Sequence, residues 1–396
     1  MRRLKIFLFC LAALLLLGGL ASYLRPLPEV EPVVYSKSVL PQSQVELPWP
    51  TYGQAAVGAR GHGVLATRGE QKAVPIASIT KVITALAVLD HRPLAEGQDG
   101  PDITLGASDT QLFEDYFARG GSVVKVAEGE KLSQLQALEA MLIPSGNNIA
   151  DSLARWAFGS VDGYVKYAND MLIEMGLTKT QVADASGFSP GSVSSAEELV
   201  KIGERALSNP VIAKIVSQKS ASLPVAGEVT NVNWLLGQDG VVGIKTGNTD
   251  EAGGCFLFAA DREIDGQTIK LIGAILGAPT RNQAISDSQL IIQKTDSGFE
   301  KRTLVKAGEA VGQYQAPWGT SALAIIQEDI SALVWKESPA EVESRLSEVK
   351  VESAKSTPTG TVTVVIGTQQ LKGKAVLAQE LSGPSFYWRI LGRILD

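Results

Sequence analysis

The sequence predicts an α+β protein, because helix-like and strand-like patterns are segregated along the chain. Apolar residues recur every three or four positions in several segments between residues 77 and 207. Apolar runs typical of strands follow residue 240. A block of helices followed by a block of strands favours an α+β architecture over alternating βαβ units. Short turns separate these strands, one of them containing Asp265-Gly266, so we expect an antiparallel sheet.

Each element has its own local signature. The first long helix is expected from Ala77 to Leu89, because its apolar residues share one face and Pro75 stands just before its start. A capping-box pattern from Ser195 to Glu198 opens a later helix. Further helices are expected over residues 132–142, 150–158, 161–175, 196–207 and 284–293, and strands over residues 63–67, 241–245, 255–260 and 268–276.

Composition excludes several classes of protein. The 396 residues include 42 acidic and 36 basic side chains, and the net charge of −6 argues against a nucleic-acid-binding protein on electrostatic grounds. The two histidines, His62 and His91, have no neighbours at metal-ligand spacing, so no metal site and no cofactor are expected. Both histidines stand in turns or polar breaks, which favours a catalytic mechanism without histidine.

The N-terminus predicts export from the cytoplasm. Arg2, Arg3 and Lys5 precede an uncharged run from Ile6 to Leu24, which is long enough to span a bilayer. Residues 1–24 are interpreted as a membrane anchor, with a cleaved signal peptide as the alternative, because Gly19-Leu20-Ala21 resembles a cleavage site. Either way the protein is extracytoplasmic, and it is held at the membrane if this segment is retained.

The rest of the chain divides by composition. Residues 25–48 contain five prolines and predict a semi-rigid spacer, and residues 49–300 form the expected catalytic domain. Residues 301–385 are rich in Val, Gly and Thr and predict a small β domain, with residues 339–357 as its most mobile part. Residues 386–396 form an amphipathic tail with Arg389 and Arg393 on one face, which either lies in a membrane interface or docks on the β domain.

Three short motifs carry the candidate chemistry. Ser78-Ile79-Thr80-Lys81 places a hydroxyl and an amine on one face of the first helix, where lysine can replace histidine as the base. Two other S-x-x-K runs start at Ser122 and Ser347, but neither opens a helix with an apolar face.

The second and third motifs supply binding groups. In Ser145-Gly146-Asn147 the hydroxyl can relay a proton and the carboxamide can hold a substrate amide, although a plain helix cap has the same composition. In Lys245-Thr246-Gly247, at the end of a strand, the polar side chains can bind a carboxylate and the glycine allows close approach of a substrate backbone.

In this order the motifs resemble those of the penicillin-recognising serine enzymes, whose signature is S-x-x-K, S-x-N and K-T-G. The chain is most similar to the serine-type D-alanyl-D-alanine carboxypeptidases, the low-molecular-mass penicillin-binding proteins. The resemblance covers residues 49–300 and includes the stretches 194–199, 231–236, 243–249 and 252–255. It implies a β-lactamase/transpeptidase-like domain, in which an antiparallel sheet adjoins a helical subdomain, followed by a small C-terminal β domain.

The resemblance also implies roles for these residues. Ser78 would be the nucleophile, Lys81 the general base and Ser145 the proton relay. The residues that would bind substrate are Asn147, Lys245, Thr246, Gly247 and Arg281. The partners would be a peptidoglycan stem peptide ending in D-Ala-D-Ala and β-lactam inhibitors, without metal or cofactor. One position departs from the family pattern, since Asn248 follows K-T-G where many members have an aromatic residue or histidine.

Three alternatives share these motifs. A class A β-lactamase would need a deacylating E-x-x-x-N pattern between the second and third motifs, and none of the glutamates there has asparagine four residues later. A transpeptidase would pass the acyl group to an amine instead of water. A non-catalytic cell-wall binding or sensor protein would keep the pocket without the reaction.

Overall fold

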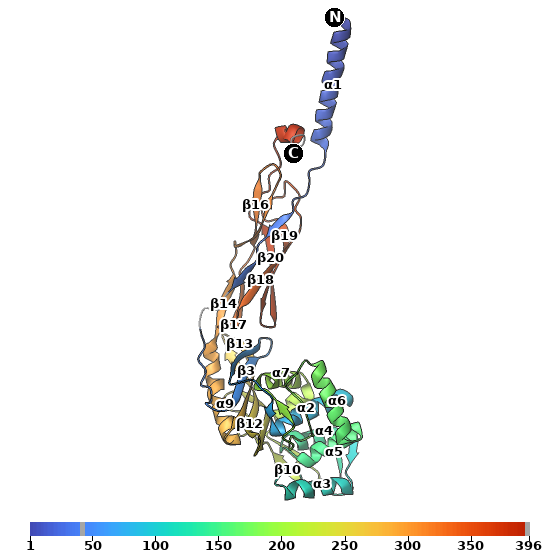
Figure 1. Cartoon of the computed structure of the whole chain (residues 1–396), viewed down its shortest axis with the longest axis vertical. Helices are drawn as coiled ribbons and strands as arrows, with labels where there is room; N and C mark the ends of the chain where they lie inside the picture. The colour runs from blue at the N-terminus through green and yellow to red at the C-terminus, as the bar shows by residue number, and fades with distance from the viewer. Residues whose placement is uncertain (40–43, 393–396) are drawn as a thin grey trace. The chain divides into compact units, whose positions relative to one another are not determined.

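The structure is a computed structural model that describes residues 1–39 and 44–392. The chain divides into two compact units. The larger unit contains residues 43–300 with Trp335–Glu337, and the smaller contains residues 1–42, 301–334 and 338–396. In sequence, the larger unit is therefore an insertion within the smaller one. Figure 1 labels several elements of each unit.

The larger unit is built on a five-stranded antiparallel sheet with the order β11-β12-β13-β3-β4. The strands are β3 (Gln54–Ala59), β4 (Gly63–Arg68), β11 (Val241–Thr249), β12 (Gly253–Ile264) and β13 (Gln267–Ala278). The α+β prediction and its antiparallel sheet are confirmed. Strand β3 was not predicted, because all six of its residues are buried and small residues remove the alternation that marks a strand.

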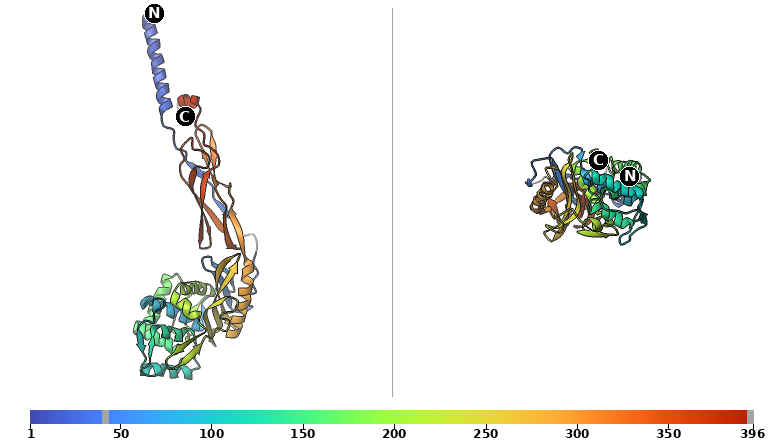
Figure 2. Two further views of the ribbon diagram at one scale, coloured as in Figure 1. Left: turned by 180° about the vertical axis from the view of Figure 1, so that it is seen from behind. Right: turned by 90° about the horizontal axis from the view of Figure 1, so that it is seen from below.

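Helices cover both faces of this sheet. Helix α9 (Arg281–Thr295) packs on one face, and the right-hand view of Figure 2 shows the other helices on the opposite face. They are α2 (Thr80–His91), α3 (Ala107–Ala118), α4 (Gln134–Leu142), α5 (Asn147–Phe158), α6 (Val161–Glu174), α7 (Ala196–Leu207) and α8 (Pro210–Val216). Helix α3 was missed because only Tyr116 among its residues is fully buried, which leaves no apolar stripe to detect.

Short paired segments connect these elements. Two-stranded sheets form between β5 (Val74–Pro75) and β8 (Val193–Ser194), between β6 (Asp102–Thr104) and β7 (Lys131–Ser133), and between β9 (Ser220–Leu223) and β10 (Gly227–Thr230). Residues 132–133, expected at the start of a helix, belong to β7, and α4 begins where the Ser133 hydroxyl accepts a hydrogen bond from the backbone of Gln136.

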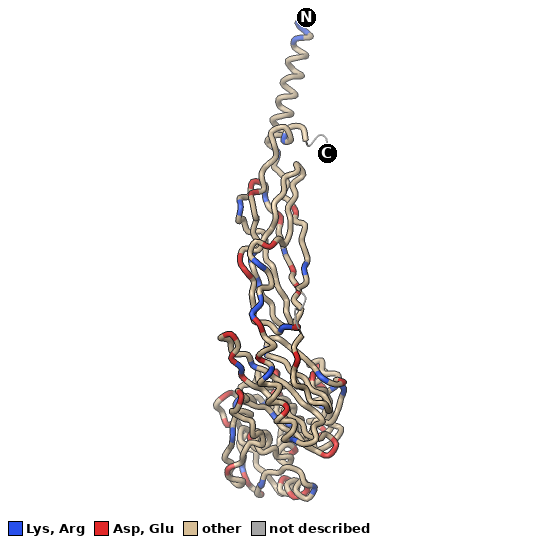
Figure 3. The backbone as a smooth tube through the Cα atoms, turned by 90° about the vertical axis from the view of Figure 1, so that its left-hand side faces the viewer, with Lys and Arg blue, Asp and Glu red and all other residues tan. Residues whose placement is uncertain are grey.

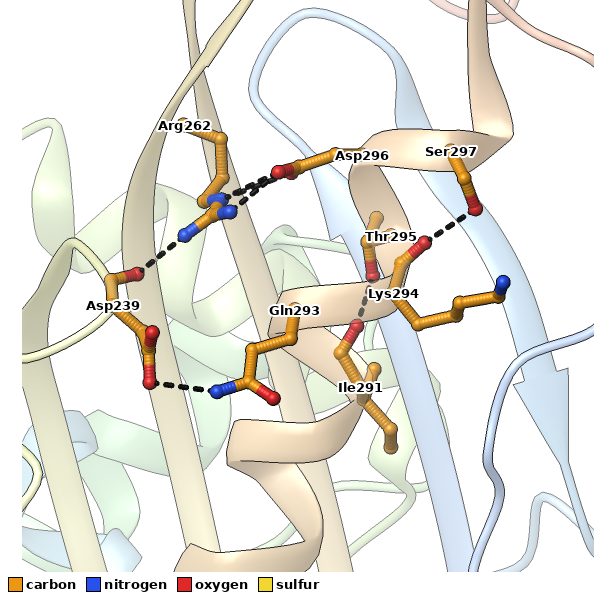
Figure 4. Close-up of polar contacts among 8 residues, drawn as sticks. All are labelled: Asp239, Arg262, Ile291, Gln293, Lys294, Thr295, Asp296 and Ser297. Carbon is orange, nitrogen blue, oxygen red and sulfur yellow. Dashed lines mark hydrogen bonds and ion pairs between the residues drawn. The ribbon is translucent and has the colours of Figure 1, made fainter.

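Polar contacts hold the end of α9 against the sheet, as Figure 4 shows. Arg262 on β12 donates to the carboxylate of Asp296 and, over 2.9 Å, to the backbone oxygen of Asp239. Gln293 on α9 donates to the carboxylate of Asp239 over 3.1 Å. Because Arg262 is bound on both sides, it links the turn before β11 to the end of α9.

The smaller unit contains a seven-stranded sheet with the order β1-β15-β16-β20-β19-β18-β2. Its strands are β1 (Pro32–Val34), β2 (Lys37–Val39), β15 (Ala310–Gln315), β16 (Ser321–Ile326), β18 (Ala340–Leu346), β19 (Pro358–Ile366) and β20 (Gln369–Leu377). Strands β14 (Phe299–Val305) and β17 (Ile330–Trp335) form a further pair.

Two segments of this unit differ from the sequence-based expectation. Residues 32–34 and 37–39, expected in an irregular spacer, pair with β15 and β18, and the nearby Val30 is buried. Residues 340–346, expected to be mobile, form β18. In both cases the backbone pairs with other strands of the sheet, and the composition of the segment alone does not indicate these partners.

Helix α1 (Arg2–Leu24) is the one helix among the described residues that is long and apolar enough to cross a membrane, and a signal sequence has the same properties. Figure 3 shows its basic residues near the start of the helix, ahead of an uncharged stretch. The Ser22 hydroxyl donates to the backbone oxygen of Arg389 over 2.9 Å, within the helical turn Trp388–Gly392 of the C-terminal tail. Arg393 lies outside the described residues.

Candidate active site

Ser78 lies in a tight turn at the start of α2. Residues Ala77–Ile79 form a 3-10 turn in which Ala77 has a positive φ of 47°. Gly187 lies against this turn, and a Cβ there would lie 1.8 Å from the Ala77 oxygen. On another side a Cβ at Gly247 would lie 3.2 Å from the backbone nitrogen of Ser78. Two glycines therefore allow a loop and a strand to approach the half-buried serine closely.

Lys81 follows one turn later and is fully buried. Its Nζ lies 2.9 Å from the Ser78 hydroxyl oxygen, 2.7 Å from the Asn147 side-chain oxygen and 2.8 Å from the Ser186 backbone oxygen. The structure thus brings the predicted serine–lysine pair together, and it adds two oxygen atoms that hold the amine in place.

The protonation state of Lys81 follows from its burial. Desolvation lowers the pKa of Lys81 to about 7, against opposing attraction from Asp184 and Asp151. A neutral amine has two N–H donors and one lone pair. The oxygens of Asn147 and Ser186 can only accept hydrogen bonds, so the hydroxyl of Ser78 is the neighbour that can donate to the lone pair. This is the hydrogen bond required of a general base and its nucleophile.

The Ser145-Gly146-Asn147 motif lies where α5 begins. Asn147 is buried, and its backbone N–H donates to the Ser122 oxygen over 2.8 Å, while Asn148 bonds both backbone groups of Val124. Ser145 is buried in a left-handed conformation with φ of 70°. Within the described chain, no direct hydrogen bond joins its hydroxyl to Lys81 or Lys245.

The third motif lies on β11, which is an edge strand of its sheet. Lys245 and Thr246 are buried, and Lys245 Nζ donates to the Thr246 backbone oxygen over 3.1 Å. Desolvation lowers the pKa of Lys245 well below its ordinary value, and repulsion by Lys81 and Arg281 lowers it further. The free edge of β11 lies near Ser78, and an extended peptide can add there as a further strand.

Arg281 is exposed at the first turn of α9, next to the end of β11. It lines a hollow of about 380 Å³ with Asn248, Pro279, Thr280 and Asn282. Its repulsion of Lys245 places positive charge at this end of the strand. The predicted carboxylate-binding residues therefore lie at one end of the site.

A loop that was not singled out from the sequence completes the site. Asp184 accepts hydrogen bonds from the hydroxyls of Ser186 and Ser192 and from backbone N–H groups of Gly187, Phe188 and Ser189. On α2, Thr84 donates to the Ala185 oxygen over 2.7 Å. The run Asp-Ala-Ser-Gly-Phe-Ser is typical of a turn, but only the folded structure shows that its Ser186 oxygen reaches Lys81.

Among the described residues, no three His, Cys, Asp or Glu side chains gather closely enough to hold a metal ion. The polar groups near Ser78 are a buried lysine one turn later, a carboxamide at the start of α5 and a second lysine on an edge strand. A serine and a buried lysine in this arrangement, beside a five-stranded antiparallel sheet, are typical of the class of penicillin-recognising serine enzymes.

Comparison with known proteins identifies the family. Residues 55–280 match the peptidase S11 family, described as D-alanyl-D-alanine carboxypeptidase, and the chain belongs to this family. The chain is 34% identical over 206 residues to the D-alanyl-D-alanine carboxypeptidase DacB2 of Mycobacterium tuberculosis, covering 50% of this chain and 66% of the relative. It is 24% identical over 329 residues to DacA of Escherichia coli, covering 80% of each chain.

Solved structures agree on the fold. Penicillin binding protein 5 from Haemophilus influenzae matches with a TM-score of 0.60 and 19% identity, covering 87% of this chain and 100% of that one. A single-residue mutant of the Streptomyces K15 DD-transpeptidase matches with a TM-score of 0.54 and 23% identity, covering 65% and 100%. The chain spans slightly less than two thirds of the length of two curated relatives. It covers 66% of DacB2 and 64% of the D-alanyl-D-alanine carboxypeptidase DacF of Bacillus subtilis.

Proposed function

We propose that the protein is a serine-type D-alanyl-D-alanine carboxypeptidase that removes the terminal D-alanine from peptidoglycan stem peptides. The observation that carries this proposal is the 2.9 Å contact between the Ser78 hydroxyl and the buried amine of Lys81. Membership of the S11 family supports the same reaction and substrate.

In acylation, the Ser78 oxygen attacks the carbonyl carbon between the two D-alanines and its proton passes to Lys81. The backbone N–H of Ser78, together with a backbone N–H from the edge strand β11, stabilises the oxyanion. Lys81 gives up this proton, which Ser145 and Lys245 relay to the departing amine, so the C–N bond breaks, D-alanine leaves and the acyl group stays on Ser78. Water then hydrolyses this ester.

Substrate binding follows from the charge distribution. Asn147 directs its oxygen toward Lys81, which leaves its NH₂ group to donate to the acyl-side carbonyl of the peptide. Lys245 and Thr246 lie in the middle of β11, and Arg281 acts electrostatically on Lys245 from beyond Asn248, so the terminal carboxylate of the peptide binds along this part of the strand. A β-lactam has a carboxylate and a reactive carbonyl at similar positions, so we expect it to acylate Ser78.

The apolar helix α1 bears on where in the cell this reaction takes place. We propose that α1 anchors the protein in the cytoplasmic membrane with the catalytic unit outside, since basic residues precede its apolar stretch. N-terminal sequencing of the mature protein tests the anchor, and a chain that begins at Ser22 would show cleavage of a signal peptide instead.

The first prediction tests the nucleophile. Ser78→Ala should abolish covalent labelling by a fluorescent penicillin and release of D-alanine from a pentapeptide, because no other hydroxyl contacts Lys81 Nζ in the described chain. Ser122→Ala and Ser347→Ala are matched controls and should retain both activities. Acylation mapped by mass spectrometry to another serine would contradict the assignment.

The same assay separates the alternatives. A tetrapeptide product with free D-alanine indicates carboxypeptidase activity, and a cross-linked product in the presence of an acceptor amine indicates a transpeptidase. Rapid turnover of penicillin indicates a β-lactamase. A folded protein that neither labels nor releases D-alanine would be a binding or sensor protein.

A further inference from the structure

A buried carboxyl group lies behind the catalytic lysine and has no role in the steps above. Asp151 is on α5, one turn after Asn147, and only 7% of it is exposed. One carboxyl oxygen accepts a hydrogen bond from the Tyr116 hydroxyl over 2.9 Å. The other oxygen, Oδ1, is buried without a hydrogen-bond partner among the described residues. A buried polar atom without a partner costs free energy and calls for an explanation.

Tyr116 connects this carboxyl group to the loop that holds Lys81. Its hydroxyl lies 3.5 Å from the Ser186 hydroxyl oxygen, and its ring packs edge-on against Phe188 at 5.5 Å. The backbone oxygen of Ser186 is the one that accepts from Lys81. Asp151 therefore adjoins, through Tyr116, the residue that orients the amine.

We propose that Asp151 and Tyr116 form a positioning pair that holds the Ser186 turn against Lys81 and supplies, with Asp184, buried negative charge that acts on Lys81. The inference rests on the proposed function, since it assigns these residues to the activation of Ser78. Neither residue contacts the nucleophile in the structure, so both act through Lys81.

Electrostatics give the sign of the effect. Burial raises the pKa of Asp151 to about 6, so its carboxylate is present at neutral pH, where its charge raises the pKa of Lys81. The other groups that act on Asp151 are Tyr116 from α3 and Asp184 from the loop, with Arg155 from its own helix. Buried Tyr164 on α6 also interacts with Asp151, and its own pKa is raised, so it stays neutral. Removing the Asp151 charge should therefore lower the pKa of Lys81 and make this base available at lower pH.

Two variants test the pair through the pH dependence of penicillin acylation. Asp151→Asn removes the charge and keeps an oxygen that can accept from Tyr116. The ascending limb of the plot of acylation rate against pH should then move to lower pH by about half to one unit. Tyr116→Phe keeps the ring on Phe188 but removes the hydrogen bond that stabilises the carboxylate, so its limb should move in the same direction by less. The double variant should match Asp151→Asn, because Tyr116 acts on the limb through the Asp151 charge.

Asp115→Asn, at an exposed position of α3, is the matched control and should keep the parent profile. Melting curves show whether each variant is folded, and Tyr116→Phe remains informative if Asp151→Asn does not fold. Folded variants with the parent profile would overturn this inference and leave the proposed function intact. A parent protein that is not acylated on Ser78 would overturn the proposed function itself.

Discussion

Two buried lysines share the site, and their mutual repulsion is the central feature at the scale of the residue. Lys81 Nζ is held by three oxygens, whereas Lys245 Nζ donates to a single backbone oxygen. Repulsion by Lys81 contributes to the lowered pKa of Lys245, and repulsion between two charges is reciprocal. The two amines therefore titrate as a pair. One lysine can stay neutral near pH 7 and act as a base, so no histidine is needed for that role.

Substitutions of Lys245 should move the acylation profile in opposite directions. Lys245→Gln removes the repulsion, so the pKa of Lys81 rises and the ascending limb moves to higher pH. Lys245→Arg keeps a fixed charge at every pH, so the limb moves to lower pH, and both variants bind the substrate carboxylate less well. Stopped-flow penicillin acylation across the neutral and basic pH range measures the limb, and profiles that coincide in parent and variants would exclude the coupling.

The residues that sequence reasoning identified are those whose partners are set by local geometry. Ser78 and Lys81 face each other because residues three apart share a helix face, so the motif alone predicted their contact. Asp151, Tyr116 and Ser186 lie in three separate segments, and their contacts exist only after α3, α5 and the 184–189 loop have packed. These three residues therefore could not be predicted from the spacing of residues in the sequence.

At the scale of the element, the site depends on how closely β11 approaches the turn that carries Ser78. A Cβ at Gly247 would lie 2.9 Å from the Ile76 oxygen and 3.0 Å from the Ala77 Cβ, with backbone or rigid atoms on the other side. An alanine there would push the strand away from the serine and displace the oxyanion-binding groups.

Gly247→Ala should therefore slow penicillin acylation by about 100- to 1000-fold, the range found when one oxyanion donor is lost. Gly106→Ala is the control, since an added Cβ at this glycine, which has an ordinary φ of −113°, meets nothing within 4 Å. Acylation rates and melting temperatures are measured together. A folded Gly247→Ala variant with the parent rate would show that the close approach is not needed for catalysis.

Elements with strong periodicity were predicted well, and the others were not. The helix that carries Lys81 begins and ends within a few residues of its expected bounds, because its apolar face is continuous. Strand β3 and helix α3 were missed because one is buried on both faces and the other is mostly exposed. In both elements, tertiary contacts rather than sequence pattern determine the structure.

At the scale of the whole molecule, the proposed membrane anchor and the strands β1 and β2 can be tested separately. Removing residues 1–24 should release most of the protein from membranes and leave a folded β unit, because the strands begin at Pro32. Removing residues 1–39 takes away β1 and β2 as well, so the β unit should lose stability by a few kcal/mol while Ser78 labelling continues. Membrane fractionation, thermal melts and penicillin labelling of both truncations measure the two roles separately. Equal melting curves for both truncations would show that the two strands contribute nothing.

The sheet order of the β unit has a consequence for biogenesis. Both edge strands, β1 and β2, come from the start of the chain, whereas every strand between them is made after the catalytic unit. Pro32 can pair only once Tyr314 has been made, and Lys37 only once Val342 has been made. The sheet can therefore be completed only late in synthesis. Its edge pairs join residues far apart in sequence, and such contacts slow folding. A chain that ends before residue 310 therefore contains the residues of β1 and β2 without the strands with which they pair.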